Sequence, residues 1–373
     1  MSLKPYIEIL IEGERHLTAE ETEAAFSEIL NGADEVQVGS LLTLLRARRE
    51  TPSEIAGMVR AMQAACRPVS LPHTTKLLDI VGTGGDGADT INISTASVVL
   101  AAACGCHVAK IGNRSVSSQC GSADVLEALG VKVDLQPPQV ENCVQQCGIA
   151  FMFAPIHHPS TARVAPVRKK LGVRTVFNML GPMTNPAGAQ HAVIGVFHPE
   201  LAPLVAGALQ QVGRIEHAVI IHGCGLDEIS PLGPSHILEV RNVTPPLASE
   251  SEQQQARVYE VKEYDFDPLT AIGIPRCQLI DLKGGGPQEN AEQFRQVLLG
   301  VGGTTDASMN AKRDAIVLNA GFGCYVYGLV DSIEAGCQLA RETLEAGKAQ
   351  EKLREWIICS QTIAASASPD IAE

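Results

Sequence analysis

From residue 77 onward, short apolar runs alternate with longer segments of helical periodicity, and this alternation restricts the fold more than any other feature. The apolar runs are LLDIV, HVAKI, VKVDL, IAFMFA, AVIGVF and HAVIIHG. The segments between them include ISTASVVLAAACG, SADVLEALG, QVENCVQQCG and LAPLVAGALQQVG. Strands that alternate with helices are typical of β-α-β units. We therefore predict an α/β fold with a mainly parallel central sheet flanked by helices.

The residues before this alternation indicate helices without strands. Two capping-box patterns begin helices there, and they pair Thr18 with Glu21 and Thr51 with Glu54. A chain of 373 residues is usually too long for a single hydrophobic core. We therefore predict a small all-helical domain over residues 1–71 and a larger α/β domain over residues 77–373.

The charge balance and the cysteine spacing argue against several classes of protein. The formal net charge is −13, from 29 Lys and Arg against 42 Asp and Glu, which disfavours a surface for nucleic acid or for anionic membranes. The most apolar run, TASVVLAAACGC, is too short to span a bilayer and is predicted to be a buried helix. The N-terminus lacks a signal-peptide pattern, and the eleven cysteines include no C-x-x-C pair that would indicate a zinc site or a disulfide framework. We therefore expect a reduced, cytoplasmic protein.

Three polar segments lie at the ends of predicted strands. GTGGDG follows LLDIV, GNRSVSSQCGS follows HVAKI, and GCGLDEIS begins where HAVIIHG ends. In open α/β sheets, ligands bind outside the carboxyl ends of the strands. We therefore expect the functional site at the sheet edge that these segments share.

The first polar segment fits two phosphate-binding patterns, but neither is complete. Its glycines match the dinucleotide fingerprint G-x-G-x-x-G and the first half of a nucleotide P-loop: Gly82, Gly84 and Gly87. A dinucleotide site needs an acidic residue about twenty positions further on, and none occurs between Asp89 and Asp124. A P-loop needs Lys and Ser/Thr where Ala88 and Asp89 stand. The loop therefore offers backbone amides to an anion without matching either ligand class.

The remaining donors favour a polyphosphate. Asn92, Ser94 and Thr95 lie at the predicted start of the next helix, where backbone N–H groups attract anions. The segment after HVAKI is rich in donors for anionic oxygens: Lys110, Gly112, Asn113, Arg114, Ser115, Ser117 and Ser118. Asp227 and Glu228 follow the last of these strands, and Mg²⁺ binds carboxylate and phosphate oxygens together. We therefore predict a polyphosphate ligand handled with magnesium.

Motifs along most of the chain resemble those of one enzyme family, anthranilate phosphoribosyltransferase. They are GTGGDG with NIST, K-x-GNR-x-x-SS with GSADVLEALG, VRKKLGVRTVFNMLGPMTNP, GLDEIS, GGGPQENA and VLNAG. They occur in order from about residue 5 to about residue 355, which is more specific than a glycine pattern alone. The resemblance implies Mg²⁺-dependent transfer of phosphoribosyl from phosphoribosyl pyrophosphate (PRPP) to the amine of anthranilate, with release of pyrophosphate, in tryptophan biosynthesis.

The resemblance also implies an architecture and a set of site residues. Helices from about 163 to 188 would join the helical domain, two Mg²⁺ ions would bind, and the protein would be a homodimer. The PRPP contacts would be Gly82, Gly85, Asp86, Thr90, Asn92, Ser94, Thr95, Lys110, Asn113, Ser115, Ser117, Ser118 and Ser122. The metal ligands would be Ser94, Asp227 and Glu228. The anthranilate contacts would be Gly82, Asn113 and Arg168, the last of which suits a carboxylate.

The implied reaction agrees with the residues present. The aromatic amine is neutral at pH 7, whereas pyrophosphate must be stabilised as it leaves. Metal ions, Lys110 and loop amides can supply that stabilisation without a dominant general base. The histidines near predicted strand ends are expected to pack or to support neighbours rather than to carry protons: His107, His157, His158 and His222.

Two positions depart from the family pattern. Ile111 stands where the family has histidine in K-H-G-N-R, which removes a polar ring from a segment expected to face the acceptor. Cys224 stands where Asp is expected before GLDE, beside the metal pair. We expect the first change to affect anthranilate binding more than PRPP binding.

Two other functions match part of the sequence pattern. A pyrimidine nucleoside phosphorylase has a related fold and glycine loop, but Asp86 and the Asp227–Glu228 pair suit a magnesium pyrophosphate ligand better. A non-catalytic nucleic-acid-binding relative would have a basic groove and weakened metal residues. The net charge of −13 and the intact GLDE point away from it.

Overall fold

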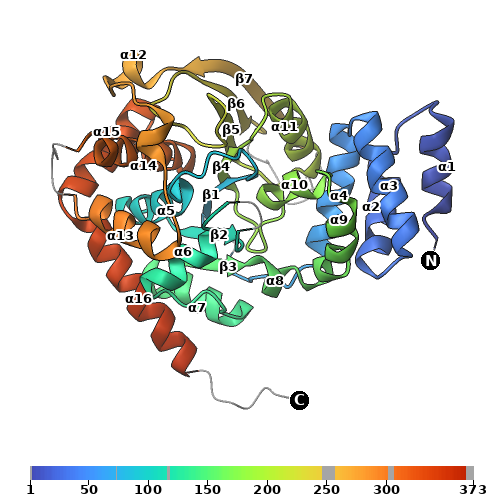
Figure 1. Cartoon of the computed structure of the whole chain (residues 1–373), viewed down its shortest axis with the longest axis horizontal. Helices are drawn as coiled ribbons and strands as arrows, with labels where there is room; N and C mark the ends of the chain where they lie inside the picture. The colour runs from blue at the N-terminus through green and yellow to red at the C-terminus, as the bar shows by residue number, and fades with distance from the viewer. Residues whose placement is uncertain (1, 73, 116–117, 246–256, 301–305, 367–373) are drawn as a thin grey trace.

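A computed structural model describes residues 2–72, 74–115, 118–245, 257–300 and 306–366, and these residues are built around a seven-stranded sheet (Figure 1). The strand order is β3-β2-β1-β4-β5-β6-β7. The strands are β1 Leu78–Gly82, β2 Val108–Gly112, β3 Ile149–Phe153, β4 His191–Gly195, β5 His217–Gly223, β6 Ser235–Asn242 and β7 Tyr259–Phe266. Strands β1 to β5 pair in parallel, and β6 and β7 add antiparallel pairs. The predicted α/β fold with a mainly parallel sheet flanked by helices is confirmed.

The two faces of the sheet pack into two different apolar cores. Val193 and Val219 face a core that contains α5 and α14, whereas Ile194 and Ile220, one position further along each strand, face a core shared with α11 and the N-terminal helices. This division follows from the period of two along a strand, which sends successive side chains to opposite faces. The helices of the α/β part are α5 Ile93–Cys104, α6 Ser122–Leu129, α7 Pro137–Cys147, α11 Leu201–Val212, α12 Pro268–Ile272, α13 Pro287–Leu298, α14 Ala307–Tyr327, α15 Ile333–Glu345 and α16 Lys348–Ser366.

The N-terminal helices form a separate group at one end of the molecule (Figure 1). They are α1 Lys4–Glu12, α2 Ala19–Leu30, α3 Glu35–Arg48 and α4 Pro52–Ala64. The long stretch between β3 and β4 contains α8 Ala154–His157, η1 Pro159–Arg163, α9 Ala165–Leu171, α10 Phe177–Leu180 and η2 Gly181–Met183. Within it, α9 and α10 lie beside the N-terminal helices, and the rings of Phe177 and Phe26 have centroids 5.5 Å apart. None of the helices in the described ranges is long and apolar enough to cross a membrane.

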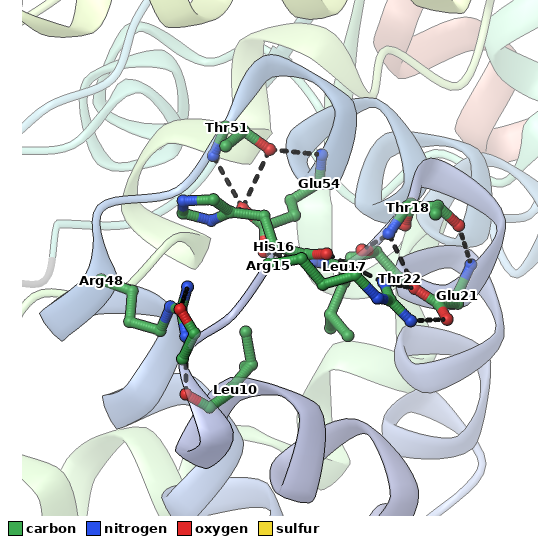
Figure 2. Close-up of polar contacts among 11 residues, drawn as sticks. Leu10, Arg15, His16, Leu17, Thr18, Glu21, Thr22, Arg48, Thr51 and Glu54 are labelled. Carbon is green, nitrogen blue, oxygen red and sulfur yellow. Dashed lines mark hydrogen bonds and ion pairs between the residues drawn. The ribbon is translucent and has the colours of Figure 1, made fainter.

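A buried carboxylate connects the start of α4 to the segment before α2 (Figure 2). Glu54 is fully buried and accepts hydrogen bonds from the Thr51 N–H at 2.8 Å, the Thr51 hydroxyl at 2.9 Å and the Leu17 N–H at 3.2 Å, while His16 Nδ1 lies at 3.2 Å. The Thr51 hydroxyl oxygen in turn accepts from the Glu54 N–H. Both predicted capping boxes are confirmed, and this one also joins two segments of the helical group.

We expect Glu54→Ala to lower the free energy of unfolding by about 2–4 kcal/mol, because it removes a helix cap and leaves buried donors without an acceptor. The matched control is Glu8→Ala on α1, which removes an exposed carboxylate 3.5 Å from Lys4 and should change stability by less than about 0.5 kcal/mol. Urea unfolding followed by circular dichroism measures both variants. Equal stabilities for the two would contradict a structural role for the Glu54 network.

The VKVDL segment was predicted to be a strand, and this prediction is wrong. Val131, Val133 and Leu135 are buried in alternation as in a strand, but residues 131–135 are not in the sheet. The place beside β2 is taken by β3, and the Lys132 N–H donates instead to Ser360 Oγ of α16 at 3.1 Å. Alternating burial therefore came from packing beneath a helix rather than from strand pairing.

Three further elements were not anticipated from the sequence. Strands β6 and β7 extend the sheet in the antiparallel sense, and α1 precedes the first capping box. The last helix, α16, continues through Ser366 into the small and polar residues near the end of the chain. Residues 367–373 lie outside the described part of the chain.

Candidate functional site

A glycine loop connects the end of β1 to the start of α5. Gly84, Gly85 and Gly87 have φ angles of 70°, 84° and 71°, in the left-handed region that glycine adopts without steric cost. The loop leads into the first turn of α5, which contains Ser94 and Thr95. Thr95 is fully buried, and its hydroxyl has no hydrogen-bond partner among the described residues. The loop and the helix start therefore present backbone amides and hydroxyls close together.

Two carboxylates from the segment after β5 reach this loop and this helix start. The Gly84 N–H donates to Asp227 Oδ2 at 2.6 Å, and the Ser94 N–H donates to Glu228 Oε1 at 3.0 Å. Asp227 is buried and Glu228 is half-buried. Burial, reinforced by the charge of Asp86, raises the pKa of Asp227 to about 7, and burial beside Asp227 raises the pKa of Glu228 to about 8. Burial therefore disfavours full ionisation of the pair, and a cation would favour it.

Lys110 of β2 places an ammonium group next to the carboxylates. Its side chain is 1% exposed, and Nζ donates to the Ile80 carbonyl at 2.6 Å and lies 3.5 Å from Ser94 Oγ. Burial lowers the pKa of Lys110, and the negative charge of Asp79 opposes that shift. The ammonium therefore lies inside the sheet edge, between β1 and the first turn of α5.

Two glycines allow the acidic segment to approach the sheet. A Cβ on Gly195 of β4 would lie 1.6 Å from the carbonyl oxygen of Asp227, and a Cβ on Gly82 of β1 would lie 2.2 Å from Asp227 Oδ2. Both separations are far below van der Waals contact. The position of Asp227 therefore depends on the absence of side chains at two neighbouring strand ends.

We expect Gly195→Ala to reduce kcat/KM by about 100-fold, since displacing a catalytic group by about 1 Å has an effect of that size. It should also lower the free energy of unfolding by about 1–3 kcal/mol through overpacking. The control is Gly39→Ala on α3, where the new Cβ would meet only side-chain atoms, at 3.7 and 3.8 Å. That change should be neutral or slightly stabilising because alanine favours helix. Steady-state kinetics and thermal unfolding measure both variants, and wild-type kinetics in Gly195→Ala would contradict the close approach.

The turn between β2 and α6 contains the second group of predicted residues. Asn113, Ser115, Ser118 and Ser122 border this turn, whereas Ser117 lies outside the described residues. The Ser115 N–H donates to Asp124 Oδ2 at 3.0 Å, and the Ser115 and Ser118 hydroxyl oxygens are 2.8 Å apart. Arg114 pairs with Asp124 at 3.0 Å and with Glu127 at 2.6 Å. The charge of Arg114 is therefore directed toward α6, and the serines provide the donors of this turn.

Asn92 and Thr90 are held by a glycine-rich segment that lies far along the chain. Asn92 stands at the N-cap of α5, but its side chain does not cap the helix. It donates instead to the Cys120 carbonyl at 2.9 Å and accepts from Asn290 Nδ2 at 3.0 Å. Thr90 forms a β-bridge with Lys283. The GGGPQENA motif and the residue before it therefore support the segment between the glycine loop and α5.

Matches to known proteins agree with this geometry. Residues 74–350 match the glycosyl transferase family, a/b domain, and residues 4–66 match the glycosyl transferase family, helical bundle domain. Anthranilate phosphoribosyltransferase from Methanosarcina acetivorans is 44% identical over 354 residues, which cover 95% of this chain and 89% of the relative. The chain belongs to the anthranilate phosphoribosyltransferase family.

Solved structures of anthranilate phosphoribosyltransferases share the whole fold. The enzyme from Thermus thermophilus superposes with a TM-score of 0.84 at 40% identity and covers 95% of this chain and 99% of its own. The enzyme from Saccharomyces cerevisiae in complex with PRPP and Mg gives a TM-score of 0.83 at 26% identity, with 96% and 98% coverage. The same yeast enzyme in complex with 4-fluoroanthranilate gives a TM-score of 0.82 at 26% identity, again with 96% and 98% coverage.

Two arginines of the VRKKLGVRTVFN motif contact different parts of this member of the anthranilate phosphoribosyltransferase family. Arg168 lies on α9 with its guanidinium 5.2 Å from the ring centroid of Phe177, and burial lowers its pKa. Arg174, three residues past the end of the helix, donates to the Gly85 carbonyl and stacks 4.2 Å from the ring centroid of Phe197. The stretch between β3 and β4 therefore touches the glycine loop through Arg174, which was not singled out from the sequence.

A buried pair behind Lys110 was also missed. Asn185 Nδ2 donates to Asp79 Oδ2 at 2.7 Å and to the Ala109 carbonyl at 2.8 Å. Burial, opposed by Lys110, raises the pKa of Asp79 to about 6. The sequence carries a weak signal here, because a lone Asp inside an apolar strand needs a partner. This signal does not indicate that the partner is Asn185, more than a hundred residues further along the chain.

The histidines near the strand ends are held by neighbouring groups. His158 Nε2 lies 2.9 Å from the Thr184 carbonyl, and burial lowers the pKa of His158 to about 4. His222 Nδ1 lies 2.9 Å from the Val196 carbonyl. His107 Nδ1 lies 3.2 Å from the hydroxyl of Tyr327, and His157 is buried with a lowered pKa. These contacts give each ring a packing role that does not involve the glycine loop.

Proposed function

We propose that this chain transfers the phosphoribosyl group of PRPP to the amine of anthranilate, giving N-(5-phosphoribosyl)anthranilate and pyrophosphate in tryptophan biosynthesis. The observation that carries the proposal is the position of Asp227 and Glu228, which contact the amides of the glycine loop and of α5. The yeast relative's complexes with PRPP and Mg and with 4-fluoroanthranilate support the two substrates.

The donor set at the carboxylates fits magnesium. Asp227 and Glu228 provide oxygen ligands, and burial raises their pKa values, so a divalent cation would favour their ionised forms. Ser94, whose N–H donates to Glu228, adds a hydroxyl. We propose that these three residues hold two Mg²⁺ ions together with PRPP. When bound, Mg²⁺ would neutralise pyrophosphate oxygens and stabilise the charge that develops as the bond from C1 to pyrophosphate breaks.

The chain's own residues then position the two substrates. Loop amides and the serine turn bind phosphate oxygens, and Lys110 directs a buried positive charge toward the leaving group. The amine of anthranilate attacks C1 from the other side, and its excess proton is lost after the C–N bond forms. Arg168 is proposed to bind the anthranilate carboxylate, with Gly82 and Asn113 beside the ring.

The proposed domain division, oligomeric state and location rest on membership of the family. We propose that residues 1–71 with helices from about 163 to 188 act as one domain and residues 77–373 as the other, so that the acceptor binds between them. A cytoplasmic homodimer is proposed on the same grounds. Size-exclusion chromatography with light scattering tests the dimer directly.

The loss of anthranilate fluorescence on adding purified protein, PRPP and magnesium tests the proposed function. Magnesium-dependent loss with equal release of pyrophosphate is expected, and a chelated sample is the control. Bound PRPP without consumption of anthranilate would contradict the acceptor. Phosphorolysis of a pyrimidine nucleoside without magnesium would contradict the whole assignment.

We expect Ile111→His to raise kcat/KM for anthranilate by about fivefold, the effect of one added hydrogen bond of about 1 kcal/mol. Ile111 is 4% exposed on β2, one residue after Lys110. Thermal unfolding must accompany the kinetics, because the new ring enters a buried position. KM for PRPP should not change. An unchanged or lower efficiency in a well-folded variant would count against an acceptor role for this position.

A further inference from the structure

Three cysteines from two distant parts of the chain meet between α7 and α16. Cys143 and Cys147 lie one turn apart on α7, and Cys359 approaches from α16, which lies beside α7 in Figure 1. The sulfur atoms of Cys143 and Cys147 are 3.7 Å apart, those of Cys143 and Cys359 are 4.0 Å apart, and all three fall within 4.8 Å of one another. Cys147 precedes the start of β3, so the cluster lies at the amino ends of the strands, opposite the glycine loop.

These separations match those of thiolates around one metal ion. A Zn–S bond is about 2.3 Å long, so two sulfurs in a tetrahedral site lie about 3.8 Å apart, and in a trigonal site about 4.0 Å apart. The separations from Cys143 to Cys147 and to Cys359 already have this spacing, and the third lies within 4.8 Å. An ion could therefore enter the triangle without a large movement of either helix.

We propose that Cys143, Cys147 and Cys359 form a binding site for a thiophilic divalent metal ion such as Zn²⁺. The fourth position would be taken by water or by the side chain of Gln146, whose Oε1 lies 3.9 Å from the sulfur of Cys359. Binding replaces thiol protons by the ion and transfers no electrons. This site is separate from the magnesium site in position and in ligand chemistry, because hard cations prefer oxygen and Zn²⁺ accepts sulfur.

The surroundings of the cluster hold the thiols in place. The Ile149 carbonyl oxygen lies 3.2 Å from the sulfur of Cys143 and 3.3 Å from that of Cys147, so both side chains are held in place before a metal binds. The hydrogen bond from Cys143 lowers the pKa of Cys147 to about 7, whereas the same bond raises the pKa of Cys143 and burial raises the pKa of Cys359 to about 11. A metal ion must therefore displace protons from at least two of the thiols. Lys352 Nζ lies 3.1 Å from the Cys147 carbonyl and 2.6 Å from Glu355 Oε2. Three thiolates with one divalent ion carry a net charge of −1, and the Lys352–Glu355 pair beside the cluster is close to neutral.

The cluster lies close to the surface at Cys359. Cys143 and Cys147 are buried, but Cys359 is only partly buried on α16. Once bound, the ion would fasten the C-terminal helix to α7 and so to the edge strand β3. Because the cluster lies at the opposite end of the strands from the glycine loop, the expected consequence is greater stability rather than faster turnover.

Cobalt titration of the full-length, reduced and chelator-treated protein tests the site, with Mg²⁺ in excess to occupy oxygen ligands. Co²⁺ bound to thiolates gives a charge-transfer absorption that oxygen ligands do not give. We expect this absorption to saturate at one equivalent and to disappear when Zn²⁺ displaces Co²⁺, since Zn²⁺ binds such sites more tightly. Zn²⁺ should also raise the melting temperature of the wild-type protein.

Cys359→Ser is the first variant, because its partly exposed position tolerates the change, and Cys147→Ser is the second. Each should weaken Co²⁺ binding by about 100-fold or more and abolish the Zn²⁺-dependent rise in melting temperature. Cys66→Ser, a partly buried cysteine at the end of the helical group, is the matched control and should bind like the wild type. Circular dichroism confirms that each variant is folded.

Three results would overturn the proposal. One is the absence of the thiolate absorption while titration shows all eleven cysteines reduced. Another is unchanged Co²⁺ binding in both Cys359→Ser and Cys147→Ser. The third is formation of a disulfide within the cluster in air with no metal uptake by the reduced protein, which would make the cluster a redox pair instead.

Discussion

Replacing Asp227 by Asn together with Glu228 by Gln should lower magnesium-dependent turnover by at least about 10³-fold, since the loss corresponds to several kcal/mol of charge stabilisation. The amide oxygens can still accept the hydrogen bonds from the Gly84 and Ser94 N–H groups, so the loop keeps its partners. Only the charge that attracts the metal is removed. Initial rates over a range of Mg²⁺ concentrations at saturating PRPP measure the effect.

The same double variant separates a metal-binding role from a structural one. Burial raises the pKa values of Asp227 and Glu228 to about 7 and about 8, so without metal the folded state loses stability as pH rises from about 4 through these values. The neutral variant lacks this penalty. At pH 8 without Mg²⁺ it should therefore melt at a temperature no lower than the wild type, and Mg²⁺ with PRPP should stabilise only the wild type.

A matched pair of exposed carboxylates provides the control. Glu263→Gln with Asp265→Asn on β7 removes two acids that lie 3.2 and 3.3 Å from His236 at the surface. Turnover and its dependence on Mg²⁺ should stay at wild-type values. Full activity in the Asp227 and Glu228 variant would refute the metal assignment, and equal losses in both double variants would show that net charge alone is responsible.

The sheet could be predicted because its central strands are buried on both faces and are therefore continuous apolar runs. β1, β2, β4 and β5 all belong to this class. The VKVDL segment was wrongly predicted to be a strand. Its side chains are buried in alternation because the segment contacts α16, not because it pairs with a strand. The polar strand β7 was missed for the opposite reason: one side of it has no further strand, and residues such as Glu260 and Lys262 are exposed. Strands were therefore predicted correctly where a segment is both buried and paired with neighbouring strands.

The residues of the site also fall into two groups. Some belong to contiguous sequence motifs, and others matter only through contacts with residues far away in the sequence. Gly85 and Ser94 could be proposed as site residues because each stands in a motif that is contiguous in sequence. Asn185 and Gly195 could not, since their importance arises from contacts with Asp79 and with the Asp227 backbone, over long separations in sequence. The cysteine cluster was not predicted from the sequence for the same reason. Its α7 pair has helical i, i+4 spacing, but the third sulfur comes from the last helix.

Lys110→Met should reduce kcat by about 10²- to 10³-fold, the size of effect expected when one preorganised charge is removed from a leaving-group site. Methionine is unbranched and only one atom shorter than lysine, so packing between β1 and β2 should change little. The ammonium that donates to the Ile80 carbonyl and lies 3.5 Å from Ser94 Oγ is lost. KM for anthranilate should change little. Single-turnover measurements at saturating substrates isolate the chemical step.

Lys110→Met should also reveal a second role of Lys110, which is to offset the negative charge of Asp79. Lys110 opposes the burial that raises the pKa of Asp79 to about 6, so its removal should raise that pKa further. A buried acid with a raised pKa costs stability as pH rises, and the melting temperature of Lys110→Met should therefore fall increasingly below the wild type between pH 6 and 8. Adding Asp79→Asn should restore the melting temperature, because an amide oxygen can still accept from Asn185 Nδ2. It should not restore turnover. If the double variant recovers both, Lys110 serves only to neutralise Asp79, and the stabilisation of the leaving group must come from the metal and the loop amides alone.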